Sequence, residues 1–198
     1  VGSEMCIRDR YHDIVTASGQ PADVVISALQ KFIRRGETEQ AARAAYELYL
    51  AGEEMTEYLW QRLKIISAED IGLGQPVAPV VVEALWSISR RFPRDTSDYA
   101  LLFIHAVRYL CACRKERGSS LLSSVTKRRI RDGEAFDLPD YVYDRHTIEG
   151  QRLGRGIEHF LTESAKVAPE ADLGPDEALW RQAMEQELAE RMKEEGEE

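Results

Sequence analysis

The densest group of side chains with an evident chemical capability is a run of bases. Between His105 and Arg131 the sequence has eight Lys or Arg residues and a single acid, Glu116. Neutralising the phosphates of a nucleic acid requires positive charge at this density, and each ion pair with a phosphate releases a counterion. The alternative is a solvated charged face without a ligand, which is the common fate of charge runs. We favour a nucleic-acid contact and predict that it is made by Arg114, Lys115, Arg117, Lys127, Arg128, Arg129 and Arg131.

The overall charge would argue against this prediction if it were spread evenly, because the formal net charge is −9 at pH 7. The acids are instead concentrated at the C-terminal end, where Glu170 to Glu198 include eleven acids and three bases. Such a division is typical of a basic working surface with a separate acidic tail. We hypothesise that the acidic segment competes with DNA for the basic side chains.

Deleting residues 171–198 is therefore expected to tighten DNA binding several-fold, because the deletion removes the internal competitor. An affinity titration of the whole chain and of the shortened chain against the same DNA measures the effect. Equal affinities of the two chains would count against the hypothesis.

Two adjacent carboxylates, Glu69 and Asp70, lie at the end of a predicted helix. Negative charge at the C-terminal end of a helix opposes the helix macrodipole, so a base must offset it. We expect that base to be a nearby side chain such as Arg62 or a base of a partner. The carboxylates could form a catalytic pair, but we favour a structural turn that fixes the exit of the helix.

Motifs of the common hydrolases are missing from the sequence. It contains no GxxxxGK[ST] phosphate loop, no GxSxG and no HExxH. A metal-dependent phosphohydrolase is the weaker alternative, with His12, Asp13, His146 or His159 as ligands, although their spacing matches no diagnostic metal pattern. We therefore predict a protein without catalytic residues, metal or cofactor.

The three cysteines predict no disulfide framework. Cys6 is isolated, whereas Cys111 and Cys113 are two residues apart on a predicted helix and point in different directions. Free, buried thiols fit a reducing cytoplasm. No apolar run approaches the roughly 20 residues that span a bilayer, and the first residues do not resemble a signal peptide. We expect a cytoplasmic protein without a membrane segment.

Helices are predicted to position these side chains, because apolar residues recur at helical spacing from Pro21 onward and glycines or prolines separate the runs. Thr56 and either Asp95 or Thr96 are the predicted N-caps. The β-branched residues after Val77 make a strand conceivable, but the length of that run favours a helix. The predicted helices cover residues 21–36, 41–52, 56–72, 77–92, 95–113, 119–131, 157–166 and 176–193.

Short connections between antiparallel helices predict an all-α bundle. Its core or an interface is expected to contain Trp60, Leu63, Ile66 and Leu85. We divide the chain into a helical assembly domain (11–132), an irregular segment with a short helix (133–170) and an acidic C-terminal helix or tail (171–198). We interpret residues 1–10 as a cloning or assembly artefact, because they lack periodicity and resemble a reading frame of a transposon end.

The segment ISAEDIGLGQP, residues 66–76, resembles the signature that follows the ATPase domain in the RarA/MgsA family of clamp-loader-like ATPases. Looser similarity extends over residues 11–14, 27–31, 52–53, 109–120 and 144–156, so that the resemblance covers about two thirds of the chain. The specific part of the motif is formed by Glu69, Asp70, Ile71, Gly72 and Leu73.

The resemblance implies a helical bundle like the clamp-loader C-terminal oligomerisation domain. It further implies a homo-oligomer, a tetramer in the family, that acts at DNA forks or single-strand junctions. Single-strand-binding protein or an ATPase subunit are the partners that it suggests. The chain would then be a non-catalytic assembly and DNA-contact module of a DNA replication and recombination-repair factor.

Two departures from the family pattern bear on that role. The sequence lacks the ATPase domain, and Arg114-Lys115-Glu116-Arg117 replaces a smoother family stretch. The gene is either truncated or a genuine short relative that works without nucleotide. The long loop and acidic tail after Asp132 favour the short relative. The rival interpretation is a protein-interaction adaptor that binds no nucleic acid.

Overall fold

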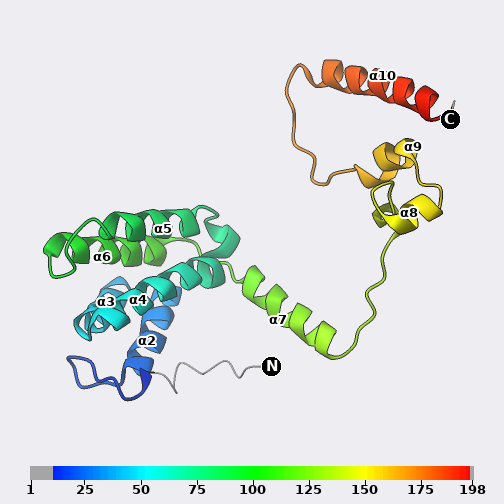
Figure 1. The fold of residues 1–198 in the computed structure, drawn as a ribbon. Coiled ribbons are helices and arrows are strands. Elements are labelled where there is room, and N and C mark those ends of the chain that lie inside the picture. The colour runs from blue at the N-terminus through cyan, green and yellow to red at the C-terminus, as the bar shows by residue number, and fades with distance from the viewer. Residues whose placement is uncertain (1–10, 197–198) are drawn as a thin grey trace. The chain divides into compact units, whose positions relative to one another are not determined.

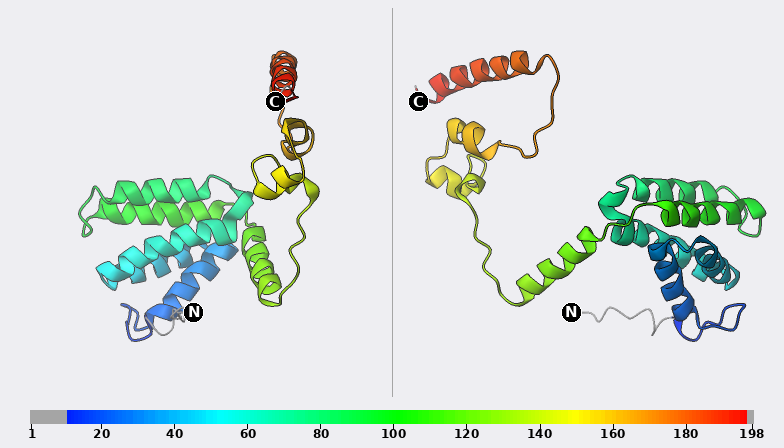
Figure 2. Two further views of the ribbon diagram at one scale, coloured as in Figure 1. Left: turned by 45° about the vertical axis from the view of Figure 1, so that its right-hand side comes forward. Right: turned by 180° about the vertical axis from the view of Figure 1, so that it is seen from behind.

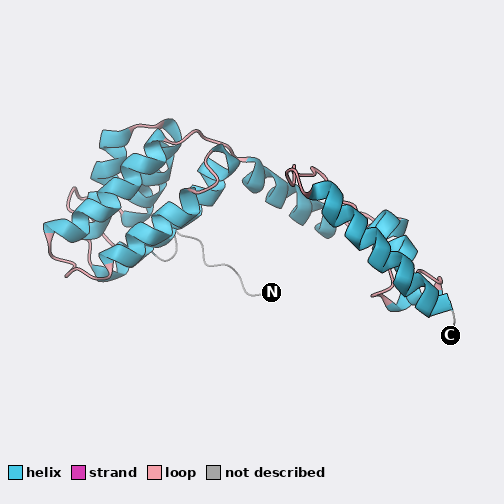
Figure 3. Ribbon diagram, turned by 90° about the horizontal axis from the view of Figure 1, so that it is seen from above, coloured by secondary structure: helices cyan, strands magenta, loops and turns pink. Residues whose placement is uncertain are grey.

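The computed structural model describes residues 11–196. These residues form helices joined by loops, and within them no strand is present apart from an isolated bridge between Val15 and Pro21 (Figures 1 and 3). The predicted all-α fold is therefore confirmed. The chain divides into two compact units, the first ending at Gly133 and the second beginning at Glu134. Residues 1–10, which we interpret as an artefact, lie outside the described residues.

The first unit is a helical bundle in which α2 packs on α3, and α5 packs on α6 (Figures 1 and 2). A last helix, α7, packs against the short turns that follow α4. The elements are α2 (Ala22–Arg35), α3 (Thr38–Leu50), α4 (Glu53–Ile66), η1 (Ser67–Ile71), η2 (Gly72–Gly74), α5 (Ala78–Ser89), α6 (Ser97–Ala112) and α7 (Gly118–Arg131).

Local chemistry explains most of the helix ends. Gly36 ends α2 with φ 75°, and its N–H donates to the carbonyls of the last turn, as is common where glycine terminates a helix. Thr96 caps α6 by accepting a hydrogen bond from the Tyr99 N–H at 3.3 Å, which confirms one of the two predicted caps. The stretch after Val77 is helical, as predicted.

The predicted N-cap at Thr56 is wrong. Helix α4 begins three residues earlier, at Glu53, because Gly52 adopts φ 117° and allows a sharp entry that other residues resist. Two acids in the first turn, Glu53 and Glu54, stabilise this helix start by interacting with the positive end of the helix macrodipole. The Thr56 hydroxyl lies within the helix and donates to the Gly52 carbonyl at 2.8 Å.

The core of the first unit is centred on Trp60, which is fully buried and donates its indole N–H to the Tyr99 hydroxyl at 3.2 Å. Leu63 and Ile66 are fully buried one and two turns further along α4, and Leu85 packs at the edge of the core. The four predicted core residues thus all contact or form the core. Burying each large aliphatic side chain contributes about 1.5–3 kcal/mol to folding.

The second unit has little core of its own. Among its described residues only Gly150 and Ile157 are buried. The segment 133–170, predicted to be irregular with a short helix, contains several short helical elements, and the Thr147 side chain caps α8 by accepting from the Gly150 N–H at 3.0 Å. The elements are η3 (Asp140–Val142), α8 (Ile148–Arg152), α9 (Ile157–His159), η4 (Phe160–Ser164) and α10 (Glu177–Gly196).

No helix in the described part of the chain is both long and apolar enough to cross a membrane.

Candidate functional site

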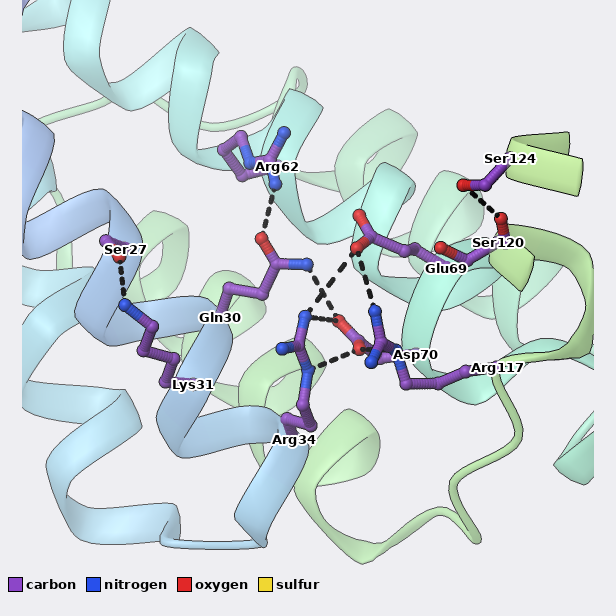
Figure 4. A network of polar contacts seen from close by, with 10 residues as sticks. All are labelled: Ser27, Gln30, Lys31, Arg34, Arg62, Glu69, Asp70, Arg117, Ser120 and Ser124. Atoms are coloured by element: carbon purple, nitrogen blue, oxygen red, sulfur yellow. Dashed lines mark hydrogen bonds and ion pairs between the residues drawn. The ribbon is translucent and has the colours of Figure 1, made fainter. Parts of the chain in front are cut away.

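The Asp70 carboxylate is fully buried in η1, at the junction of α2, the end of α4 and the entry to α7. Figure 4 shows Arg34 and Gln30, both from α2, pointing toward it. Arg34 Nε donates to Asp70 Oδ1 at 2.6 Å, and Gln30 Nε2 donates to Oδ2 at 2.9 Å. Because both carboxylate oxygens accept hydrogen bonds, the buried charge is paired and solvated by protein donors.

A second arginine reaches the same carboxylate from the segment that precedes α7. Arg117 Nε lies 3.3 Å from Asp70 Oδ1, and Arg117 Nη2 lies 3.8 Å from Glu69 Oε1. Arg34 Nη2 also approaches Glu69 Oε1, at 3.6 Å (Figure 4). We call Gln30, Arg34, Glu69, Asp70 and Arg117 the Asp70 network. It joins three segments that are distant in sequence, so it fixes the exit of the α4–η1 helical run.

The expected offsetting base, Arg62, has a different role. Its Nη2 donates to Gln30 Oε1 at 2.6 Å, so that Arg62 orients Gln30 and reaches Asp70 only through it. Arg34 and Arg117 supply the offsetting charge instead. Sequence reasoning missed Gln30 and Arg34, although their spacing of four residues places them on the same face of α2, which is a usable signal.

Two of the seven predicted DNA-contact residues, Lys115 and Arg117, are held by contacts with the helical bundle. Lys115 Nζ donates to the carbonyls of Leu110, Cys111 and Cys113 at 2.9, 2.9 and 2.6 Å. These carbonyls belong to the end of α6, where they lack partners within the helix, and a Lys there satisfies them. Arg117 belongs to the Asp70 network. Both bases therefore stabilise the bundle, and Arg114 is exposed beside them.

The remaining four predicted contacts lie together on the C-terminal half of α7. This helix has no buried residue. The side chains of Arg128 and Arg131 are 77% and 75% exposed, and both pair with Asp132, at 3.4 and 3.1 Å. Lys127 and Arg129 are exposed as well. We call Lys127, Arg128, Arg129 and Arg131 the α7 basic cluster.

The α7 helix also exposes apolar side chains. Leu121 is 63% exposed, Leu122 67% and Val125 46%. Leu121 and Val125 are four residues apart and share one face of the helix, with Leu122 beside them. On the other side, serines 119, 120, 123 and 124 line a shallow groove with Ile65, Ala68 and Glu69. The Leu121–Val125 face is therefore turned away from the bundle.

A second apolar face is exposed on α5. Val80 is 67% exposed and Ile88 40%, and Val77, just before the helix, is 52% exposed. Together with Ala84 these residues repeat at intervals of three or four and form one stripe along the helix. Helix α5 buries only Ala78, Val82 and Ser89 among its residues, so much of its apolar surface faces outward.

The histidines considered as metal ligands have other contacts. His12 Nδ1 lies 3.5 Å from Asp23 Oδ1 in the first unit, and His159 Nε2 lies 3.0 Å from Asp140 Oδ2 in the second. The hydrogen bond from His159 lowers the pKa of Asp140. Across residues 11–196, no three His, Cys, Asp or Glu side chains come together in a way that could hold a metal ion.

The described cysteines are free thiols. Cys111 is buried and Cys113 is half-buried, whereas Cys6 lies outside the described residues. Burial raises the pKa of the Cys111 thiol, which keeps it protonated and unreactive at neutral pH.

Comparison with known proteins found a matching family model and similar relatives. A family model described as the C-terminal part of the MgsA AAA+ ATPase matches residues 36–195. Replication-associated recombination protein A of Haemophilus influenzae is 27% identical over 151 residues, which cover 76% of this chain and 31% of that protein. An uncharacterised AAA domain-containing protein of Mycobacterium tuberculosis is 26% identical over 131 residues, covering 66% of this chain and 28% of that protein. The chain thus spans less than a third of the length of these relatives.

Proposed function

Because the chain belongs to the family of MgsA AAA+ ATPase C-terminal domains, we propose that it is a non-catalytic module that contacts DNA through α7 and self-associates through its exposed apolar helix faces. The name of the Haemophilus influenzae relative, a replication-associated recombination protein, supports a role in DNA replication and recombination repair. We propose that the module acts in the cytoplasm.

The α7 basic cluster is the single observation that carries the DNA-contact proposal. Its four bases lie within five residues at the end of a helix that buries none of its side chains. Long, exposed cationic side chains can reach phosphates without disrupting the packing of a core. Arg128 and Arg131 pair with Asp132, and such exposed ion pairs contribute little free energy.

The apolar residues of α7 favour DNA with unpaired bases over a continuous duplex. The side chains of Leu121, Leu122 and Val125 have no charge or hydrogen-bond donor for a phosphate. They can instead pack against bases that are unstacked or splayed. Such bases occur at forks and single-strand junctions. The resemblance to the family suggests the same DNA, with single-strand-binding protein or an ATPase subunit as partners.

The proposal is tested by titrating a fluorescently labelled forked DNA with residues 11–198. We expect saturable binding at low salt, and we expect unlabelled forked DNA to compete better than a duplex of equal length. Equal competition by both would remove the preference for unpaired bases. No binding at low salt would leave the rival function, a protein-interaction adaptor, as the better account.

Self-association is proposed to use the α5 stripe. Val80→Glu places a charge in the middle of this stripe, and desolvating that charge in an interface would be costly. We expect the variant to have a smaller assembly mass than the tetramer proposed for the wild type, with unchanged helix content because Val80 is 67% exposed. Sedimentation velocity measures the assembly mass of the variant and of the wild type.

Leu50→Glu is the matched control for Val80→Glu, since Leu50 is 57% exposed at the end of α3 and lies outside the stripe. The control is expected to keep the wild-type mass. If Val80→Glu also keeps it, the α5 stripe is not the interface.

A further inference from the structure

We propose that Glu116 is a positioning residue that fixes the direction of α7 and thereby presents the α7 basic cluster to DNA. This inference rests on the proposed DNA-contact function. Glu116 is the single acid in the basic stretch from His105 to Arg131. By charge alone it should weaken phosphate binding, so its presence there requires another explanation.

The contacts of Glu116 supply that explanation. Its Oε1 accepts a hydrogen bond from the Gly118 N–H at 2.5 Å, at the first residue of α7, where helix N–H groups have no partner within the helix. Its Oε2 accepts from the Leu73 N–H at 3.1 Å. Its own N–H donates to the Asp70 carbonyl at 3.0 Å. One residue thus joins the start of α7 to the turn that follows the Asp70 network.

Glycines make this close approach possible. A Cβ at Gly72 would lie 2.6 Å from both the carbonyl and the carboxylate oxygen of Glu116, and Gly72 has φ 50°. A Cβ at Gly74 would lie 2.5 Å from the Arg114 carbonyl, and one at Gly118 would collide with Glu116 Oε1. Real Cβ atoms do not approach oxygens so closely. The absence of a side chain at Gly72, Gly74 and Gly118 therefore leaves room for Arg114 and Glu116.

The direction of α7 depends strongly on this clamp, because α7 packs against η1 and η2 without burying any of its own residues. A helix without such an anchor would sample many directions. Binding to DNA would then restrict the helix to one direction, and the loss of conformational entropy would lower the affinity. Glu116 reduces this entropy loss because it already orders α7 in the protein without DNA. Its effect on DNA is therefore opposite in sign to that of an ordinary acid among bases.

The decisive comparison is between two variants that each neutralise one acid of the region. Glu116→Gln puts an amide NH₂ against one of the two N–H donors and is expected to weaken binding to forked DNA about tenfold, with a shallower salt dependence. Asp132→Asn releases Arg128 and Arg131 from their ion pairs and is expected to leave affinity equal to or higher than that of the wild type. If Glu116→Gln instead tightens binding as Asp132→Asn does, the proposal is overturned.

A third variant separates position from charge. Gly118→Ala leaves every charge in place but displaces the Glu116 carboxylate, and alanine favours the helix more than glycine does. Weaker DNA binding by this variant supports the clamp, because neither lost charge nor lost helix propensity explains it. Wild-type affinity in Gly118→Ala would count against the clamp.

Hydrogen exchange tests the clamp without DNA. The amides of Leu73 and Gly118 should exchange slowly in the wild type and much faster in Glu116→Gln, while amides in the core of α4 keep their protection. Unchanged exchange at Leu73 and Gly118 would contradict the inference. Absence of DNA binding by the wild type, with the exchange difference present, would instead refute the proposed function and leave the clamp as a structural element.

Discussion

Replacing Asp70 by alanine is expected to lower the free energy of unfolding by about 3–5 kcal/mol, toward the lower end of that range. The carboxylate is fully buried, and Arg34, Gln30 and Arg117 all point at it. Its removal leaves two guanidinium groups without their main anionic partner. Because Arg34 and Arg117 are 30% and 42% exposed, water recovers part of the loss. Urea unfolding followed by circular dichroism measures the difference.

The neighbouring acid provides the control. Glu69 is 29% exposed and makes longer ion pairs, at 3.6 and 3.8 Å, so Glu69→Ala should cost at most about 1 kcal/mol. A similar loss from both variants would mean that the network is not centred on Asp70. A small loss from Asp70→Ala would support the rival interpretation, in which the two acids form a catalytic pair.

The largest expected effect on DNA affinity comes from the triple substitution Lys127→Ala, Arg128→Ala and Arg129→Ala. We expect binding to forked DNA to weaken about a hundredfold at low salt, because up to three phosphate contacts are lost together. Stability should change little, since α7 has no buried residue and alanine favours helices. Fluorescence anisotropy measures the affinity, and thermal unfolding checks the fold.

A control for the triple substitution removes the same charge elsewhere in the first unit. Arg43, Arg90 and Arg91 are exposed, and replacing all three by alanine lowers the net charge equally. We expect this control to weaken binding only slightly, through the general field of the protein. Equal weakening in both triple variants would show that DNA responds to net charge and not to the α7 basic cluster.

The sequence was most informative where structure depends on local chemistry. Apolar spacing predicted the helices and the burial of Trp60, Leu63 and Ile66. The side-chain cap at Thr96 and the left-handed turn at Gly36 depend on neighbouring residues alone, and both could be recognised. At Thr56 the same reasoning failed, because Gly52 has no side chain yet supplied the better entry to the helix.

The candidate site could be predicted only in part, because its contacts join residues that are distant in sequence. Arg34 and Asp70 are 36 residues apart, and Leu73 and Glu116 are 43 apart. No spacing rule connects such pairs. For the same reason charge density could not separate Lys115, which closes the end of α6, from Lys127, which is exposed on α7. Charge density marks the whole basic stretch, whereas the packing separates the bases held by the bundle from those that are exposed.

The most direct test of the central claim, that α7 contacts DNA phosphates, is the salt dependence of forked-DNA binding by the wild-type chain. Each phosphate contact contributes about 0.9 to the slope of log affinity against log salt concentration on duplex DNA. With the four bases of the α7 basic cluster engaged, we predict a slope of about −3 to −4. A slope near zero, or no binding at the lowest salt, would contradict the account.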